Sequence, residues 1–209
     1  MTVLDIDTVP GLARAHLHTV DEPRGALVLG HGAAGGVEAP DLVAATEAAR
    51  AEHVSVALVE QPYRVAGRRS PASASRLDAA WLAVLQRLRA DVLGDLPLIV
   101  GGRSLGARVA CRGAEASGAI AVLCLAFPLQ PRRRAGTPPQ SRLPELDAVT
   151  LTTLVVQGEH DPFGIPPPGP SREVARVPGD HSLRADPSAV GAAVRAWLPR
   201  AVGEPAPAR

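Results

Sequence analysis

Leu-Pro-Leu-Ile-Val-Gly-Gly-Arg-Ser-Leu-Gly, residues 96–106, is the stretch that decides the fold of this chain. The aliphatic run at its start is typical of a strand buried on both faces, and residues 105–116 have helical composition. Between them lies Gly-x-Ser-x-Gly, which in this setting predicts a tight strand-to-helix turn with Ser104 exposed at its apex. The glycines are needed because larger side chains next to the serine would collide in so sharp a turn. We therefore expect a nucleophile elbow at Ser104.

On both sides of this unit, short aliphatic runs alternate with longer Ala-rich stretches. Strands are expected at 26–30, 54–59, 97–101, 119–125 and 151–156, with two more at about 12–20 and 173–177. Helices are expected at 39–53, 72–90, 105–116 and 187–198. This order predicts one α/β domain, a mostly parallel sheet with helices on both faces, over residues 1–202. Residues 203–209 are expected to form a disordered tail.

Composition narrows the class of protein. A length of 209 residues suits one domain, and all 22 basic residues are arginine, which removes lysine Schiff-base and P-loop chemistry. The net charge of +1 gives no reason to expect nucleic-acid or membrane binding. There is no basic leader and no apolar run of about 20 residues, so a cytoplasmic protein is expected. Cys111 and Cys124 are interpreted as buried, reduced thiols.

A serine nucleophile needs a base, and the base needs an acid to orient it. After an elbow the expected chain order is serine, acid, histidine, each following a strand. Asp161 lies three residues beyond the strand that ends at Gly158, and His181 follows a short strand just before the last helix. These spacings make Asp161 the candidate acid and His181 the candidate base.

Alternatives exist for both roles. Glu159 and Asp180 are other acids near the right positions, although Asp180 adjoins the histidine in sequence, which points the two side chains apart. His160 is another base, but it shares a loop with the candidate acid. The remaining early histidines are interpreted as surface or core residues: His16, His18 and His53.

A second glycine-rich loop follows an expected central strand, in Leu-Val-Leu-Gly-His-Gly-Ala-Ala-Gly-Gly, residues 27–36. Such a loop can offer a free backbone N–H beside the elbow, so we assign Ala33 as one oxyanion donor, with Ala34 as the alternative, and Leu105 as the second. His31 is expected to order the loop through hydrogen bonds. The stretch lacks the glycine spacing of a dinucleotide site, and no Gly-Lys-Ser/Thr occurs.

Four motifs together resemble the α/β-hydrolase superfamily, in its dienelactone-hydrolase-like branch: HGAAGG (31–36), GGRSLGAR (101–108), VQGEHDPFG (156–164) and GDHSL (179–183). More narrowly, they are similar to small bacterial hydrolase-like proteins related to a eukaryotic testis-expressed protein, as are QPYRVAGRR (61–69) and FPLQP (127–131). The resemblance covers roughly residues 25–200. It implies Ser104 as nucleophile, Asp161 as acid and His181 as base. One departure is Gln130, where such relatives are expected to carry histidine.

No cap domain is expected, because only a Pro- and Arg-rich loop of about twenty residues follows the strand that ends near Phe127. The substrate site is therefore expected to be shallow. Its candidate walls are Tyr63, Phe127, Leu129 and Phe163, and further pocket candidates are His31, Arg64 and Arg103. Trp81 and Trp197 lie in expected helices and are interpreted as packing residues.

Several arginines fall in segments that follow strands, around the expected site: Arg64, Arg68, Arg69, Arg103 and Arg132–Arg134. One interpretation is that they are solvated loop residues in a lysine-free protein. The other is that they select substrates bearing a carboxylate or phosphate, which the guanidinium fork binds bidentately. The sequence leaves both open.

These residues predict a serine hydrolase that cleaves an ester or thioester of a small soluble substrate, which is anionic under the second interpretation of the arginines. No cofactor or metal is expected, because no Cys/His ligand spacing occurs. The alternative is a non-catalytic interaction module on the same scaffold, since fold alone does not establish function. The sequence does not indicate an oligomeric state.

Overall fold

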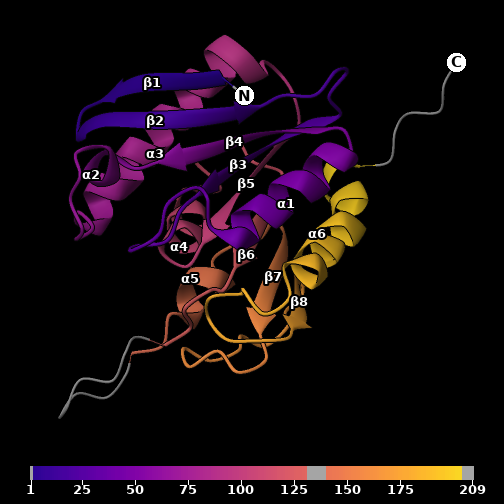
Figure 1. The fold of residues 1–209 in the computed structure, drawn as a ribbon. Coiled ribbons are helices and arrows are strands. Elements are labelled where there is room, and N and C mark those ends of the chain that lie inside the picture. Colours follow the sequence, from indigo (N-terminus) through magenta and orange to yellow (C-terminus); the bar gives the residue numbers. More distant parts are fainter. Residues whose placement is uncertain (1, 131–139, 204–209) are drawn as a thin grey trace, which may run out of the picture.

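The computed structural model describes residues 2–130 and 140–203, and it centres on an eight-stranded sheet in the order β1-β2-β4-β3-β5-β6-β7-β8 (Figure 1). β1 and β2 form an antiparallel hairpin that joins β4 in antiparallel fashion, and the other neighbours are parallel. The strands are β1 (Thr2–Thr8), β2 (Gly11–His18), β3 (Gly25–Gly30), β4 (Val54–Glu60), β5 (Leu98–Arg103), β6 (Ala121–Leu125), β7 (Thr152–Gly158) and β8 (Arg172–Val177). The predicted α/β architecture is confirmed.

Helices cover both faces of the sheet, as Figure 1 shows. They are α1 (Pro40–Ala51), α2 (Pro62–Val65), α3 (Ala74–Leu88), α4 (Leu105–Gly113), α5 (Leu143–Asp147) and α6 (Pro187–Val202), with a π-helical turn at Arg89–Leu93. Trp197 of α6 and Leu42 of α1 lie in the core on one face. Trp81 of α3 and Val109 of α4 lie in the core on the other. Both tryptophans are buried, which agrees with their interpretation as packing residues.

The central strands are buried along nearly their whole length, which explains why they are continuous aliphatic runs. Cys111 and Cys124 are both buried free thiols, with their sulfurs 3.5 Å apart between α4 and β6. The carboxyl ends of β3, β5, β6 and β7 meet at one edge of the sheet, where the loops carrying the candidate residues follow.

Several elements differ from the sequence prediction, among them the short helix α2, which was not expected. β1 was not expected, because only Ile6 of this edge strand is buried and its acidic residues mask the pattern. A short helix, α5, ends the Pro-rich stretch that was expected to be irregular. α6 continues beyond residue 198 to Val202 despite Pro199 inside it. Residues 204–209 of the expected tail lie outside the described residues.

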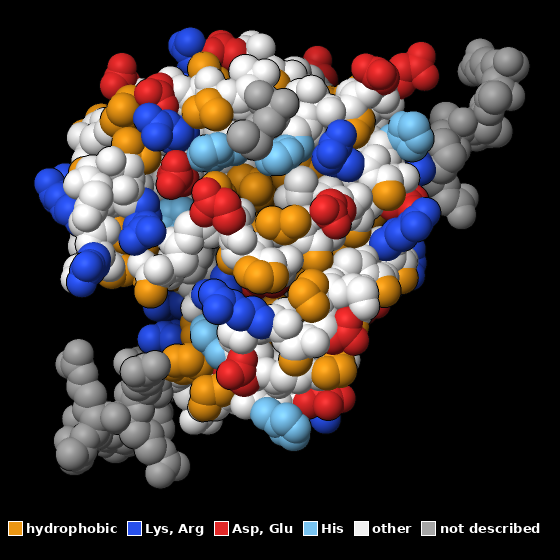
Figure 2. Space-filling view, in the orientation of Figure 1, with side chains coloured by type: hydrophobic (Ala, Val, Ile, Leu, Met, Phe, Trp, Pro, Cys, Tyr) orange, Lys and Arg blue, Asp and Glu red, His pale blue; other side chains and the backbone are white. Residues whose placement is uncertain are grey.

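The surface mixes charges of both signs on the face seen in Figure 2, where hydrophobic side chains appear among them in small groups. Among residues 2–130 and 140–203, no helix combines the length and the apolar character that crossing a bilayer requires.

Candidate active site

Ser104 stands at a strained turn between β5 and α4. Its φ of 52° and ψ of −106° place a non-glycine residue in a region that L-residues rarely adopt. Its N–H donates to the carbonyl of Leu125 at 2.9 Å, which fixes the turn against β6. A Cβ at Gly106 would meet the carbonyl oxygen of Gly30, and one at Gly102 would lie 2.5 Å from the same oxygen. The turn is therefore packed directly on the end of β3, and only glycine fits on either side of the serine.

The structure brings Ser104, His181 and Asp161 together in one hydrogen-bonded chain. The Oγ of Ser104 lies 2.9 Å from Nε2 of His181, and Nδ1 of His181 lies 2.8 Å from Oδ2 of Asp161. The side chain of Asp161 is fully buried, and that of His181 is 17% exposed. A neutral histidine with Nδ1 protonated in this arrangement can accept the hydroxyl proton at Nε2, while the buried carboxylate stabilises the resulting imidazolium.

The Asp161 carboxylate is held from two further sides. Its Oδ1 accepts the N–H of Phe163 at 2.8 Å, and its Oδ2 lies 2.7 Å from Nε2 of Gln157. The amide of Gln157 is buried in β7 and also lies within hydrogen-bond distance of the carbonyls of Phe127 and Gly164. Gln157 was not among the site residues expected from the sequence. Its signal was a single amide side chain inside an otherwise aliphatic strand.

The rival acids and base are engaged elsewhere or exposed. Asp180 accepts two hydrogen bonds from Ser182, at 2.8 Å from the backbone N–H and 2.6 Å from the hydroxyl, and these lower the pKa of its carboxyl. Glu159 and His160 are exposed. Of the three early histidines, His16 contacts Glu60 at 3.0 Å on the hairpin side of the sheet. His18 and His53 are a half-buried strand residue and an exposed turn residue.

The loop after β3 is ordered by His31. Its Nε2 accepts the backbone N–H of Gln61 at 3.1 Å, so Nδ1 carries the proton and donates to the carbonyl of Gly32 at 2.7 Å. The N–H of Gly35 donates to the same carbonyl at 3.3 Å. Because a trans peptide directs its C=O and N–H oppositely, fixing the Gly32 carbonyl also fixes the direction of the Ala33 N–H.

Among the described residues, neither the N–H of Ala33 nor that of Leu105 has a hydrogen-bond acceptor. Leu105 is the first residue of α4, where backbone donors are normally unsatisfied and favour negative charge. The hydroxyl of Tyr63 donates to the carbonyl of Ala33 at 3.0 Å, which orients the next N–H, that of Ala34. The N–H of Ala33 and the N–H of Ala34 therefore both remain candidates for the loop donor expected from the sequence.

Phe127 does not line the site, which corrects the sequence prediction. Its side chain is fully buried in the core on the α3 and α4 side, because Ala126 before it has a left-handed φ of 49° that turns the chain. Phe163, by contrast, stands beside the base, with its ring centroid 4.4 Å from that of His181. Leu129 is half-buried and packs against Gly164, next to Phe163.

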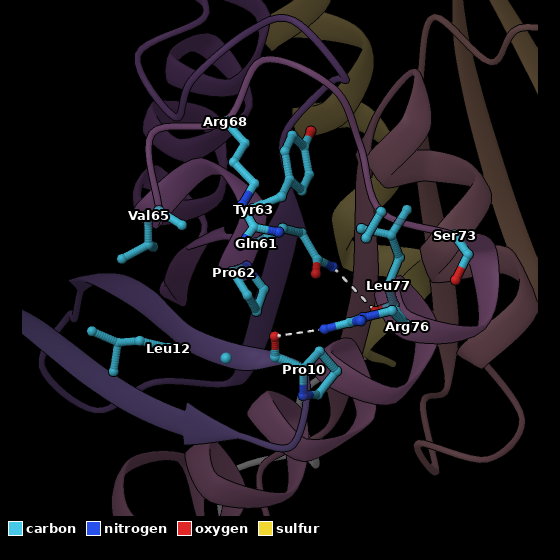
Figure 3. Close-up of a pocket in the computed structure, with 13 residues that line it drawn as sticks. Pro10, Leu12, Gln61, Pro62, Tyr63, Val65, Arg68, Ser73, Arg76 and Leu77 are labelled. Atoms are coloured by element: carbon cyan, nitrogen blue, oxygen red, sulfur yellow. Dashed lines mark hydrogen bonds between the residues drawn. The ribbon is translucent and has the colours of Figure 1, made fainter.

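Tyr63 and His31 are 4% and 1% exposed, and both bond to backbone carbonyls of the loop after β3. A groove of about 580 Å³ lies between the β1–β2 hairpin, α2 and the start of α3. In Figure 3 the Tyr63 ring points away from Pro10 and Arg76, which also line this groove. Burial raises the pKa of Tyr63 to about 12, so its hydroxyl stays protonated and available as a donor to the Ala33 carbonyl.

The candidate arginines separate into distinct environments. Arg103 is tied into the site by bonds to Asp41 and to the carbonyl of His181. Arg64 is half-buried, and within residues 2–130 and 140–203 its side chain has no hydrogen-bond or ion-pair partner. Arg68 and Arg69 are exposed, and Arg132–Arg134 lie outside the described residues.

His31 makes the loop sensitive to acid. Burial lowers the pKa of His31 below the 6.5 of an ordinary histidine, so unfolded chains bind a proton before folded ones do. Neutral His31 therefore contributes its full stabilising free energy above pH 6.5, and this contribution is lost as the pH falls through the lowered pKa of the folded protein. We expect the urea midpoint of the wild type to fall more between pH 7.5 and pH 5 than that of His31→Gln. Equal falls in both proteins would contradict a buried neutral histidine.

The fold and the position of Ser104 define the class: a sheet with the α/β-hydrolase strand order and a serine elbow after its central strand. The chain belongs to the alpha/beta hydrolase domain family, whose model matches residues 23–185. No curated protein matches the chain in sequence.

Solved structures share the fold at low sequence identity. A serine hydrolase without a lid from Xanthomonas campestris is 19% identical, with 95% of each chain covered and a TM-score of 0.71. Est1E from Butyrivibrio proteoclasticus is 14% identical over 97% of this chain and 99% of that one, with a TM-score of 0.75. A serine hydrolase homologue from Coxiella burnetii is 12% identical over 94% and 97%, with a TM-score of 0.73.

Proposed function

We propose that this protein is a serine hydrolase that cleaves an ester or thioester of a small molecule. The observation that carries the proposal is the continuous chain from Ser104 Oγ through His181 to the buried Asp161, at a strained elbow. The motif resemblance to the dienelactone-hydrolase-like branch, and to the small hydrolase-like proteins related to a testis-expressed protein, supports a carbonyl ester as the reacting group.

In the acylation step, Ser104 Oγ attacks the substrate carbonyl while His181 Nε2 accepts the hydroxyl proton. Asp161 keeps Nδ1 protonated and stabilises the imidazolium. The developing oxyanion accepts hydrogen bonds from the N–H of Leu105 and from the loop N–H of Ala33 or Ala34. His181 then gives its proton to the leaving alcohol or thiol, and the acyl-enzyme remains.

In the deacylation step, His181 removes a proton from water as the water attacks the acyl carbonyl. Collapse of the second tetrahedral intermediate breaks the bond to Ser104, which takes its proton back from the imidazolium. The acid product leaves and the resting hydrogen-bonded chain is restored. Every proton in this cycle passes between Ser104, His181, water and the leaving alcohol or thiol, so the cycle balances.

A fluorophosphonate probe tests the proposal directly, because it labels only serines that are activated as nucleophiles. The wild type is expected to be labelled at Ser104, as located by peptide mass spectrometry, and Ser104→Ala is expected to stay unlabelled. Competition by simple aryl esters and thioesters would then rank acyl groups. A folded wild type that the probe does not label would overturn the proposal and favour the non-catalytic interaction module.

The substrate class is proposed to include anions, with Arg64 as the selecting residue. The charge of Arg103 is balanced by Asp41, whereas that of Arg64 has no carboxylate partner among the described residues. Arg64 directly follows Tyr63, whose hydroxyl donates to the Ala33 carbonyl of the oxyanion loop. A partly buried cation in this position is suited to a substrate carboxylate.

Two matched esters, one neutral and one with a remote carboxylate, measure this preference. We expect kcat/KM to favour the anionic ester by about tenfold, or about 1.4 kcal/mol, and the ratio to shrink with added salt. Arg64→Gln is expected to remove the preference and keep turnover of the neutral ester, while Arg87→Gln on α3 leaves both unchanged. If only charge reversal of Arg132–Arg134 abolishes the preference, the selecting charge lies there instead.

A further inference from the structure

We propose that Arg103, neutralised by Asp41, is a positioning residue that holds the backbone of His181 and the oxyanion loop in register with Ser104. This inference rests on the proposed function, since it concerns the geometry of the same site. It gives a role to Arg103, the charged residue of the Gly-Gly-Arg-Ser-Leu-Gly elbow, which takes part in no step of the hydrolase mechanism.

The guanidinium of Arg103 contacts three separate segments of the chain. Its Nε donates to Oδ2 of Asp41 at 3.1 Å, and its Nη2 donates to the carbonyl of His181 at 3.0 Å. Its Nη1 lies against Gly32, where an added Cβ would be only 2.6 Å away. One planar group therefore spans the start of α1, the loop that carries the base and the loop that carries an oxyanion donor.

Asp41 is built to keep that group in place. Its side chain is fully buried at the start of α1, and besides Arg103 it accepts the N–H of Leu42 at 3.0 Å. Burial raises the pKa of Asp41, which the neighbouring Arg103 charge opposes. A buried ion pair gains little net stability, because both charges lose their hydration. Its distinctive contribution is directional, since the fork of arginine holds its acceptors at fixed angles.

His181 needs such support because it lies between β8 and α6, outside regular secondary structure. Its ring is held by Asp161, but its main chain is held on the elbow side by Arg103. Since a misplacement of about 1 Å can cost about 100-fold in rate, loss of this bond is expected to slow acylation without affecting substrate affinity.

The decisive experiment compares variants in kcat, KM and the second-order rate of fluorophosphonate labelling, with folding checked by circular dichroism. Arg103→Met is expected to lower kcat and the labelling rate by about 10- to 100-fold with KM changed by less than about threefold. Arg103→Lys keeps the charge but cannot reach both acceptors in one plane, so it should restore only part of the rate.

Arg112→Met is the matched control. Arg112 forms a partly buried ion pair with Asp78 through two bonds, at 2.9 and 2.6 Å, and also lies 3.7 Å from Glu145. These contacts link α4 to α3 and α5, and neither partner belongs to the site. Arg112→Met should lower stability and leave kcat and labelling unchanged. Gly32→Ala and Asp41→Asn disturb the same guanidinium without removing it. They are expected to lower kcat in the same way, which keeps the test valid if Arg103→Met does not fold.

The outcomes are distinguishable. If the wild type is not labelled at Ser104, the proposed function fails. If the wild type is labelled, and Arg103→Met, Asp41→Asn or Gly32→Ala folds yet retains the wild-type kcat and labelling rate, then the positioning role is wrong and the ion pair is structural. A loss of rate that Arg112→Met shares would lead to the same conclusion.

Discussion

Ser104→Ala and His181→Ala are each expected to fold normally and to lower kcat by about 10³–10⁶-fold on any ester that the wild type cleaves. Removing the hydroxyl leaves no atom to form the acyl-enzyme, and removing the imidazole leaves the hydroxyl proton without an acceptor. Because the two groups act in one step, the double variant should be about as slow as either single variant. Steady-state rates on an activated ester, with thermal melts as the folding check, measure this.

The acid is tested by the matched pair Asp161→Asn and Asp180→Asn. Asparagine at 161 keeps the shape but favours the wrong histidine tautomer, so a loss of about 10⁴-fold is expected. Within the part of the chain that the structure describes, the Asp180 side chain bonds to Ser182 alone, so Asp180→Asn should stay within a few-fold of the wild type. A slow Asp180→Asn beside a fast Asp161→Asn would reassign the acid. If the losses in kcat simply add when Asp161→Asn is combined with His181→Ala, the two residues do not act as one coupled chain.

The fold was predictable because its central strands are aliphatic on both faces and its elbow has a local signature. Continuous runs such as residues 119–125 have few structural alternatives, and Gly-x-Ser-x-Gly after one of them marks a strand-to-helix turn. The N-terminal strand was not predictable in this way. It is an edge strand in which one side chain, Ile6, is buried, so its period is masked by the exposed Asp5 and Asp7.

Within the site, the residues with chemical signatures were predictable and their supports were not. Ser104, His181 and Asp161 each follow a strand and carry a reactive group. Gln157 and Arg103, by contrast, bond to distant backbone carbonyls, those of Phe127, 30 residues back in the chain, and His181, 78 residues further along. Phe127 was misassigned because a single left-handed residue before it reverses the direction of its side chain. Backbone conformation of that kind has no residue-type signature when the residue is alanine.

Gly106 is where the fold and the site depend on the same atom-scale contact. The elbow helix α4 approaches the end of β3 so closely that a Cβ at Gly106 would meet the carbonyl oxygen of Gly30, come within 2.5 Å of its carbon and lie 2.9 Å from the carbonyl oxygen of His31. All three are backbone atoms, which cannot rotate away as a side chain does. The strain has to be relieved by moving α4 or β3 as a unit.

Gly106→Ala is therefore expected to lower the free energy of unfolding by about 3 kcal/mol, the upper end of overpacking costs. For a chain of this length that is a fall in Tm of about 6–12 °C. Gly191→Ala, inside α6, is the control of opposite sign, since its Cβ would lie 3.5 Å from the carbonyl oxygen of Ala44 in α1, an ordinary contact distance. There alanine should add about 0.5–1 kcal/mol, because glycine is the poorer helix former.

The same substitution also shows whether the elbow and the oxyanion loop move together. Pushing α4 away from Gly30 and His31 displaces the Leu105 N–H relative to the loop donor, so in Gly106→Ala the two should no longer converge on one oxyanion. We expect kcat to fall by about 100-fold or more at temperatures where the variant remains folded, since one lost oxyanion donor costs about 10²–10³-fold. A destabilised variant with an unchanged kcat would show that the Leu105 N–H is not an oxyanion donor. A variant as stable as the wild type would show that α4 and β3 do not pack this closely in solution.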